Sequence, residues 1–208
     1  QMTEFAITGG IGSGKSTVSA ALETRGAKLV DADEVVRELQ RPSGEIFTNL
    51  VQEFGEIIIN EDGQLNRQKL ADIAFSDPGD LEKLNKIVHP AVGKEMAKRR
   101  NAFIRQGYIV LVDIPLLVTS EGTLARKEYQ DFTGKIVIDC DEKIAVSRLV
   151  KFRGFREDDA WARIDKQASR KQRLEFADFV IDNNGDNDSL EVQIDSCWSW
   201  MTSLDSEE

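Results

Sequence analysis

The sequence predicts an α/β fold in which a five-stranded parallel sheet is flanked by helices. Five short apolar segments lie near residues 4–8, 28–31, 108–113, 135–139 and 178–182. They show no polar face and alternate with helical patterns, which is typical of parallel strands covered on both sides. The long interval between the second and third segments has a mostly helical pattern. We therefore expect a helical insertion in an otherwise regular α/β core.

The elements at the N-terminal end follow from the residues that flank them. A helix is expected over about 15–25, and Gly26 would end it, because glycine readily adopts the conformation that follows a helix. A second helix should follow the strand at 28–31 and reach Gln40, because Pro42 cannot continue it.

The insertion, over residues 43–106, predicts several helices. An apolar stripe at helical spacing indicates the first helix, and Asn66 suits the cap of the next. Ser76-Asp77-Pro78 is a helix start signal. His89-Pro90 is another, from which a long amphipathic helix would run to Gly107. The apolar stripe consists of Ile46, Phe47, Leu50, Val51 and Phe54.

Three further helical segments are expected towards the C-terminal end. Asp141 can cap a helix that reaches about Phe152. Residues 156–176 predict a helical segment with its apolar side chains on one face. A last helix should extend from about residue 189 to 201.

Residues 9–17, Gly-Gly-Ile-Gly-Ser-Gly-Lys-Ser-Thr, form a phosphate-binding loop between the first strand and the first helix. Backbone N–H groups of such a loop surround nucleotide phosphates, and the helix N-terminus favours negative charge. Lys15 would reach the β- and γ-phosphates, and Ser16 would bind Mg²⁺. The pattern predicts a nucleotide and leaves the phosphate acceptor open. The residues expected to bind the nucleotide are Gly10, Ile11, Gly12, Ser13, Gly14, Lys15, Ser16 and Thr17.

Carboxylates at two strand ends extend the predicted site. Asp33 suits either a general base that deprotonates an alcohol or the cap of the following helix. Asp31 is expected to hold Mg²⁺ through water, and Asp113, after the third strand, is an alternative for that role. An alcohol acceptor needs a base, whereas a phosphate acceptor is already an anion.

The charge of the chain is unevenly distributed. The formal net charge is −10, which argues against general nucleic-acid binding. From Arg148 to Arg173, however, nine basic and four acidic residues give a local balance of +5. Arginines on a mobile segment can stabilise the charge of a transferring phosphoryl group, and Gly154 offers a hinge. We expect a lid over about 150–175, with Arg163 and Gln167 on one helix face.

Composition limits the remaining possibilities. The 208 residues suit one α/β core with an insertion, and no apolar run approaches the ~20 residues that span a bilayer. We also expect no signal peptide, because the first strand starts almost at once. Two distant cysteines favour free thiols and a cytoplasmic location, and a single histidine excludes a histidine metal cluster.

These motifs, taken in order, resemble the dephospho-CoA kinase family over almost the whole chain. The resemblance implies a P-loop NTPase fold of the nucleoside-monophosphate-kinase type, and ATP-dependent phosphorylation of the ribose 3′-hydroxyl of dephospho-CoA with Mg²⁺. It implies a nucleotide-binding core over about 1–40 and 108–208, a helical acceptor domain over 41–107 and a lid. The chain would be a monomer or weak oligomer. The motifs are residues 9–17, Asp31-Ala32-Asp33 with Arg37, His89-Pro90, Pro115-Leu116-Leu117, Arg148-Leu149, Arg153, Arg163 with Gln167, and residues 177–185.

The same resemblance implies roles for individual residues. Asp33 would be the general base, and Arg148 and Arg153 would contact the phosphates of ATP. The residues implied at the adenine are Asn183, Asn184 and Gly185, and those implied on the acceptor side are Arg37, His89, Leu116 and Leu117. Core packing is the alternative for the two leucines, as is a helix cap for His89. Arg173 stands where the family commonly has lysine.

Two other functions compete with this interpretation. A nucleoside or nucleotide kinase of the same architecture would share the loop and the lid. A GTPase switch protein would share the loop, but it needs an Asn-Lys-x-Asp motif that the sequence lacks.

Overall fold

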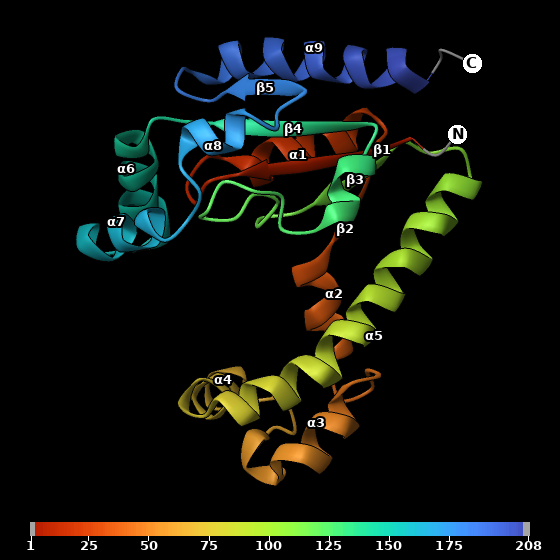
Figure 1. Cartoon of the computed structure of the whole chain (residues 1–208), viewed down its shortest axis with the longest axis vertical. Helices are drawn as coiled ribbons and strands as arrows, with labels where there is room; N and C mark the ends of the chain where they lie inside the picture. Colours follow the sequence, from red (N-terminus) through yellow and green to blue (C-terminus); the bar gives the residue numbers. More distant parts are fainter. Residues whose placement is uncertain (1–2, 206–208) are drawn as a thin grey trace. The chain divides into compact units, whose positions relative to one another are not determined.

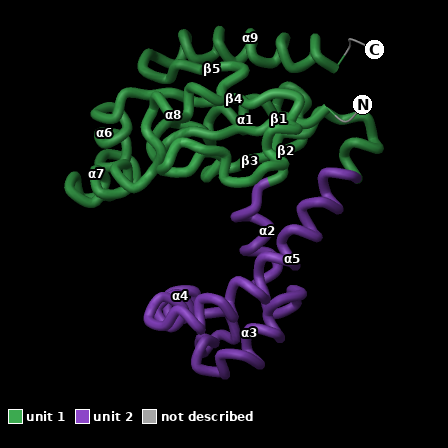
Figure 2. The backbone as a smooth tube through the Cα atoms, in the orientation of Figure 1, with its two compact units in different colours: residues 1–30, 102–208 green, residues 31–101 purple. Residues whose placement is uncertain are grey.

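The computed structural model describes residues 3–205, which form two units. Among these residues, unit 1 comprises 3–30 and 102–205, and unit 2 comprises 31–101 (Figure 2). Unit 2 begins at Asp31, earlier in the chain than the expected insertion.

Unit 1 is built on the predicted five-stranded parallel sheet, in the order β2-β3-β1-β4-β5 (Figure 1). The central strand β1 pairs in parallel with β3 on one side and β4 on the other, and β4 pairs with β5. The third strand starts two residues later than expected. The strands are β1 Glu4–Gly9, β2 Lys28–Asp31, β3 Val110–Asp113, β4 Gly134–Asp139 and β5 Phe179–Asp182.

Two helices cover one face of this sheet. They are α1 (Lys15–Arg25) and α9 (Asn187–Asp205), whose apolar residues pack with those of β1, β3, β4 and β5 in one core cluster. Phe5 and Ile7 of β1 are fully buried in it. Arg25 joins the helices from outside through ion pairs with Glu191 (2.8 Å) and Asp195 (2.6 Å). The two helices therefore pack firmly on one face of the sheet. The loops described below follow the C-terminal ends of the strands.

The basic segment of unit 1 contains α6 (Glu142–Arg153), α7 (Glu157–Asp165) and α8 (Arg170–Leu174), and the 3₁₀ helix η2 (Lys127–Asp131) precedes β4. The expected helical segment over 156–176 is interrupted at residues 166–169. Ser169 starts a new helix there, because its hydroxyl accepts from Gln172 N (3.1 Å) and Gln172 Oε1 accepts from Ser169 N (2.8 Å). This reciprocal cap outweighs helix continuation.

Unit 2 is helical and has its own apolar core. Asn66 caps α4 as predicted, by accepting a hydrogen bond from Lys69 N (2.9 Å). Leu50 and Ile58 are fully buried at the centre of the core. The elements are α2 (Ala32–Leu39), α3 (Phe47–Phe54), the 3₁₀ helix η1 (Glu56–Ile58), α4 (Arg67–Ser76) and α5 (Pro78–Arg105), whose last residues belong to unit 1.

The predicted helix start at His89-Pro90 is wrong, because α5 runs through both residues without a break. An interior proline loses one backbone hydrogen bond, but its φ is already helical. Ile87, Val88 and Ala91 around it pack on the core of unit 2, which favours the continuous helix. His89 therefore lies in mid-helix with an exposed side chain, and it caps nothing.

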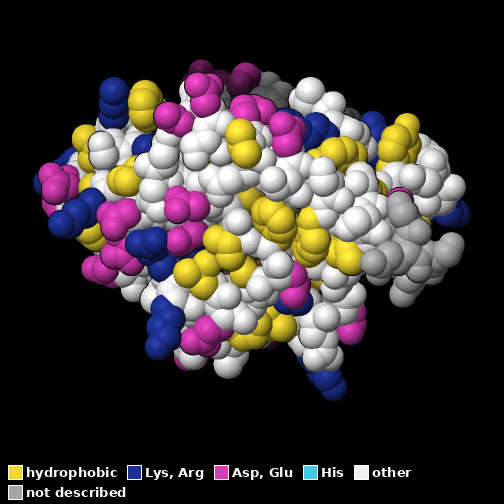
Figure 3. Space-filling view, turned by 90° about the horizontal axis from the view of Figure 1, so that it is seen from above, with side chains coloured by type: hydrophobic (Ala, Val, Ile, Leu, Met, Phe, Trp, Pro, Cys, Tyr) yellow, Lys and Arg dark blue, Asp and Glu magenta, His cyan; other side chains and the backbone are white. Residues whose placement is uncertain are grey.

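The surface of unit 1 over α9 mixes acidic, basic and hydrophobic side chains (Figure 3). Within residues 3–205, none of the helices combines the length and the apolar character that a membrane crossing requires.

The contact between Gly134 and Trp200 gives a stability prediction. A Cβ on Gly134 would overlap the indole ring and lie 2.9 Å from its Cζ2 atom. We expect Gly134→Ala to lower the free energy of unfolding by about 1–3 kcal/mol, because the β4–α9 packing must open. Urea unfolding measures this change. Gly93→Ala is the control: it has free space in α5 and should be neutral or stabilising by about 1 kcal/mol. Equal effects of the two variants would contradict the prediction.

Candidate functional site

The phosphate-binding loop joins β1 to α1, as the motif requires. Gly12 (φ +76°) and Gly14 (φ +88°) adopt left-handed conformations, which favour glycine over any other residue. Space demands glycine as well, because a Cβ on Gly14 would overlap Asn183 Nδ2 and one on Gly12 would lie 2.7 Å from Ala145 O. The glycines of the motif are therefore fixed by backbone geometry and by close neighbours.

Lys15 and Asp113 form an ion pair at the start of α1. Asp113 ends β3, which lies next to β1 in the sheet, so the loop and this carboxylate come from adjacent strand ends. Asp31 ends β2, one strand further from the loop. The sheet order thus brings Asp113, the alternative magnesium ligand, to the loop.

Arg148 and Asn183 converge on the carbonyl of Ser13. Asn183 Nδ2 donates to Ser13 O (2.8 Å), and Arg148 Nη1 donates to it over 3.4 Å. Arg148 Nη2 also donates to Asn183 O (2.6 Å). The two residues therefore hold the loop against α6 and the end of β5. Both were predicted at the nucleotide, and the structure brings both to the loop.

Asn184 connects two neighbouring strand ends. Its Oδ1 accepts from Asp141 N (2.6 Å), and its Nδ2 donates to Asp182 Oδ1 (2.7 Å). Asp141 in turn caps α6 by accepting from Lys143 N (2.9 Å). Gly185 follows in the same turn. This segment fixes the position of the helix that leads into the predicted lid.

The predicted lid also touches the loop through Gln167, whose Oε1 accepts from Ile11 N (2.9 Å). Ile11 packs against the apolar cluster of α6 and α7. Two arginines flank the ring of Phe155: Arg153 Cζ lies 5.6 Å and Arg163 Cζ 5.2 Å from its centroid. These two arginines make cation–π contacts with Phe155 and are exposed to solvent.

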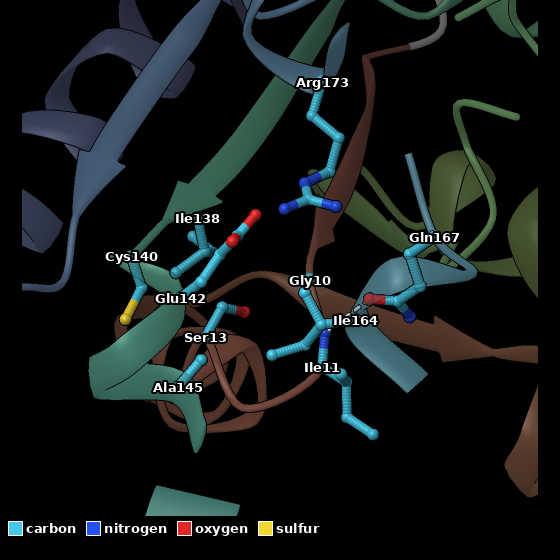
Figure 4. A pocket seen from close by; sticks show the side chains of 10 residues that line it. All are labelled: Gly10, Ile11, Ser13, Ile138, Cys140, Glu142, Ala145, Ile164, Gln167 and Arg173. Carbon is cyan, nitrogen blue, oxygen red and sulfur yellow. Dashed lines mark hydrogen bonds between the residues drawn. The ribbon is translucent and has the colours of Figure 1, made fainter. Parts of the chain in front are cut away.

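A small cavity of about 20 Å³ lies against the loop (Figure 4). Ser13 and Arg173 contribute polar groups to it, and Cys140 lines it from the end of β4. Burial raises the pKa of the Cys140 thiol, so the neutral thiol is favoured there.

Beside this cavity, Arg170 forms a bidentate pair with Asp139, from Nε (3.0 Å) and Nη2 (2.8 Å). These hydrogen bonds hold the pKa of Asp139 below its ordinary value. The sequence analysis did not select Asp139. The signal was present, because β2, β3, β4 and β5 all end in aspartate.

Asp31, and not Asp33, caps the helix that follows β2. Asp31 is the cap of α2, since its Oδ1 accepts from Asp33 N (2.8 Å). The alternative that Asp33 caps the helix is therefore wrong. Within residues 3–205, the carboxylate of Asp33 makes no hydrogen bond or ion pair, and it is exposed. Arg37 lies one turn later on the same face, with Nε donating to Asp33 O (3.2 Å).

The Pro115-Leu116-Leu117 segment of unit 1 presents only one of its leucines. Leu116 is 66% exposed, whereas Leu117 is completely buried. Leu117 therefore serves core packing in this structure, which was the alternative to a substrate contact. Leu116 is available to a ligand.

The residues fit a magnesium ion bound mainly by phosphates and water. Residues 3–205 contain no group of three or more His, Cys, Asp or Glu side chains that could hold a metal. The hydroxyl of Ser16 and the carboxylate of Asp113 are oxygen ligands of the kind that Mg²⁺ prefers. The protein would supply one or two ligands, as is usual where a nucleotide brings the rest.

The parallel sheet, the glycine loop with Lys15 and the arginine-rich segment after β4 define a P-loop kinase. A model of the dephospho-CoA kinase family matches residues 4–189. A dephospho-CoA kinase from Thermobifida fusca is 40% identical over 197 residues, covering 95% of each chain. One from Corynebacterium glutamicum is 42% identical over 193 residues, covering 92% of this chain and 94% of the relative. The chain belongs to the dephospho-CoA kinase family.

Solved structures share this fold. A crystal structure from Thermus thermophilus has a TM-score of 0.74 at 27% identity and covers 95% of this chain and 97% of its own. The dephospho-CoA kinase from Campylobacter jejuni has a TM-score of 0.68 at 20% identity, covering 96% and 97%, and supports the fold.

The Asp139–Arg170 pair gives a pH-dependent prediction. We expect Asp139→Asn to lower the free energy of unfolding at pH 7 by about 1–3 kcal/mol, because two charge-assisted hydrogen bonds are lost. The lowered pKa of Asp139 stabilises the fold above the ordinary carboxyl pKa of about 4, and this contribution disappears as pH falls through the folded value. The two proteins should therefore converge below pH 4.

Denaturant unfolding between pH 3 and 7 tests this expectation. Asp141→Asn is the matched control, since asparagine also caps helices and Asp141 Oδ2 lies 3.6 Å from Arg170. A difference between Asp139→Asn and the unmodified chain that stays constant with pH would contradict the assigned role.

Proposed function

We propose that this chain transfers the γ-phosphoryl group of ATP to the ribose 3′-hydroxyl of dephospho-CoA and produces coenzyme A and ADP. This is the final step of coenzyme A biosynthesis. The observation that carries the proposal is the family match over residues 4–189, which spans the phosphate-binding loop, unit 2 and the basic segment. A hydroxyl acceptor also agrees with the carboxylate of Asp33, which has no partner among the described residues. A phosphate acceptor would not need such a base.

In this proposal the loop amides and Lys15 bind the phosphates of ATP. Lys15 would exchange Asp113 for the β- and γ-phosphates when the nucleotide binds. Ser16 would be a ligand of Mg²⁺, and the ion would supply positive charge that offsets the charge developing on the phosphates. Asp113 is the stronger candidate for the carboxylate near this ion, because Asp31 already caps α2 and ends a strand further away. The water-mediated role of Asp31 at this ion stays a prediction.

The chemistry of the acceptor falls to unit 2. Asp33 would accept the proton of the 3′-hydroxyl group. At the same time the hydroxyl oxygen would bond to the γ-phosphorus of ATP, and the bond between that phosphorus and the ADP oxygen would break. Arg37, one turn along α2, would hold an anionic group of the acceptor. His89, exposed on α5, and Leu116 are proposed to complete the acceptor surface.

Arg148 and Arg153 would stabilise the charge of the transferring group from the lid. Asn183, Asn184 and Gly185 would lie beside the adenine. Support for these roles comes from the hydrogen bonds of Arg148 and Asn183 to the loop carbonyl of Ser13. The cytoplasmic location and the monomeric or weakly oligomeric state remain predictions.

An acceptor panel with ATP tests the function. Purified protein should phosphorylate dephospho-CoA and leave nucleoside monophosphates unchanged. Turnover of nucleoside monophosphates without dephospho-CoA turnover would favour the alternative, a nucleotide kinase. Slow GTP hydrolysis that no acceptor accelerates would favour a GTPase.

Asp33→Asn tests the base. We expect kcat to fall by about 10²–10⁴-fold while the Kd for ATP stays nearly unchanged, because a positioned general base is lost and the loop is intact. Steady-state kinetics and calorimetric ATP binding measure the two quantities. Glu34→Gln, the exposed neighbour on α2, is the control. An unchanged kcat in Asp33→Asn would reduce Asp33 to a surface residue of the helix.

Lys15→Ala tests the loop. We expect both weaker ATP binding and a lower kcat, since the ammonium group binds the phosphates in the ground state and in the transition state. The same two measurements apply. Full ATP affinity in this variant would show that the loop does not bind the phosphates as proposed.

A further inference from the structure

Arg173 of α8 directs its guanidinium group at the first half of the phosphate-binding loop (Figure 4). A Cβ on Gly10 would lie 2.8 Å from Arg173 Nη2 and 3.2 Å from its Cζ. The guanidinium group therefore lies close to Gly10 and leaves no room for a side chain there. On its other side, Nη1 donates to Ala168 O (2.6 Å), in the connection between α7 and α8.

The charge of Arg173 is not neutralised by an ion pair among residues 3–205. Arg170, one turn earlier on the same helix, forms an ion pair with Asp139. Arg173 Nε is instead buried and has no hydrogen-bond partner among these residues. A half-buried cation whose Nε has no hydrogen-bond partner is unfavourable unless an anion compensates it.

The charged groups near Arg173 agree with this picture. Burial lowers the pKa of Arg173 from its ordinary value, and the positive charge of Arg170 acts in the same direction. The carboxylates of Asp139 and Glu142 oppose that change from β4 and α6, although Asp139 already pairs with Arg170. The compensation that the protein itself provides is therefore incomplete.

The loop meets Arg173 across the cavity described above. Gly10, Ile11 and Ser13 line it together with Arg173 and Gln167. Ser13 Oγ is a second buried polar atom without a hydrogen-bond partner among residues 3–205. Gln167 Oε1 accepts a hydrogen bond from Ile11 N. Polar groups of the α7–α8 connection and α8 therefore position the loop segment. The positive charge of Arg173 has no ion-pair partner among residues 3–205.

We propose that Arg173 is a positioning residue of the phosphate-binding loop, and that its unpaired charge is compensated by the nucleotide phosphates that the loop binds. This inference rests on the proposed function. Because the interaction is electrostatic, its contribution should grow with the number of phosphates and weaken at high salt.

The test compares Arg173→Met, which keeps the length of the side chain, with Arg173→Lys, which keeps its charge. Calorimetric Kd values for the Mg²⁺ complexes of ATP and ADP, and for AMP, are measured at low and high salt. In Arg173→Met the Kd for ATP should rise by about 10- to 100-fold, with a smaller change for ADP and the smallest for AMP. Arg173→Lys should stay within about threefold of the unmodified chain. Lys171→Met removes an exposed charge from the same helix and should have little effect.

Several results would overturn the proposal. Equal losses for ATP, ADP and AMP would indicate a merely structural role, as would a loss in Arg173→Lys equal to that in Arg173→Met. Unchanged ATP binding in Arg173→Met would exclude any role. If Arg173→Met does not fold by circular dichroism, Arg173→Gln is measured against Arg173→Lys in the same series. Failure of the unmodified chain to bind ATP would contradict the proposed function instead.

Discussion

The carbonyl of Ser13 is the point on which the nucleotide site depends. It accepts hydrogen bonds from Asn183 and Arg148, which come from the end of β5 and from α6. The loop has an internal hydrogen bond from Ser13 N to Gly10 O (3.1 Å), and contacts from outside further fix the turns at its left-handed glycines. Side chains distant in the sequence do this, so the loop enters nucleotide binding already organised. Preorganised amide dipoles act on phosphate without the cost of reorganisation.

Electrostatics at the strand ends gives a second constraint. Four of the five strands end in aspartate, and each carboxylate has a different partner. Asp31 accepts from a helix N–H, Asp113 pairs with Lys15, Asp139 pairs with Arg170, and Asp182 accepts from Asn184. Of these partners, Arg170 comes from the basic segment, and its charge is paired with Asp139. Part of the positive charge of this segment therefore belongs to the fold, and the remainder is available to an anionic ligand.

The sequence predicted what local patterns control. Strand apolarity, the loop motif and the caps at Asn66 and Asp141 depend on neighbouring residues, and the structure confirms them. The helix through Pro90 could not be predicted, because packing in unit 2 decides it. The break before Ser169 was missed although its Ser-x-x-Gln capping pattern is local. The neighbours of Asp139 and Arg173 could not be predicted from the sequence, because they depend on which distant segments the fold brings together. The sequence also could not show that Leu117 is buried and Leu116 exposed, because tertiary packing decides which of the two side chains enters the core.

Asn184 connects the turn after β5 to the start of α6. Its amide group bonds to Asp182 on one side and to the first residue before α6 on the other, and α6 leads into the arginine-rich segment. A base that settles beside residues 183–185 would thus act on the same turn that anchors α6. Binding free energies are reciprocal, so whatever favours the base there must equally favour the arrangement of α6 that best accommodates it. Binding of the adenine and closure of the arginine-rich segment over the phosphates would then be thermodynamically coupled through the turn that contains Asn184.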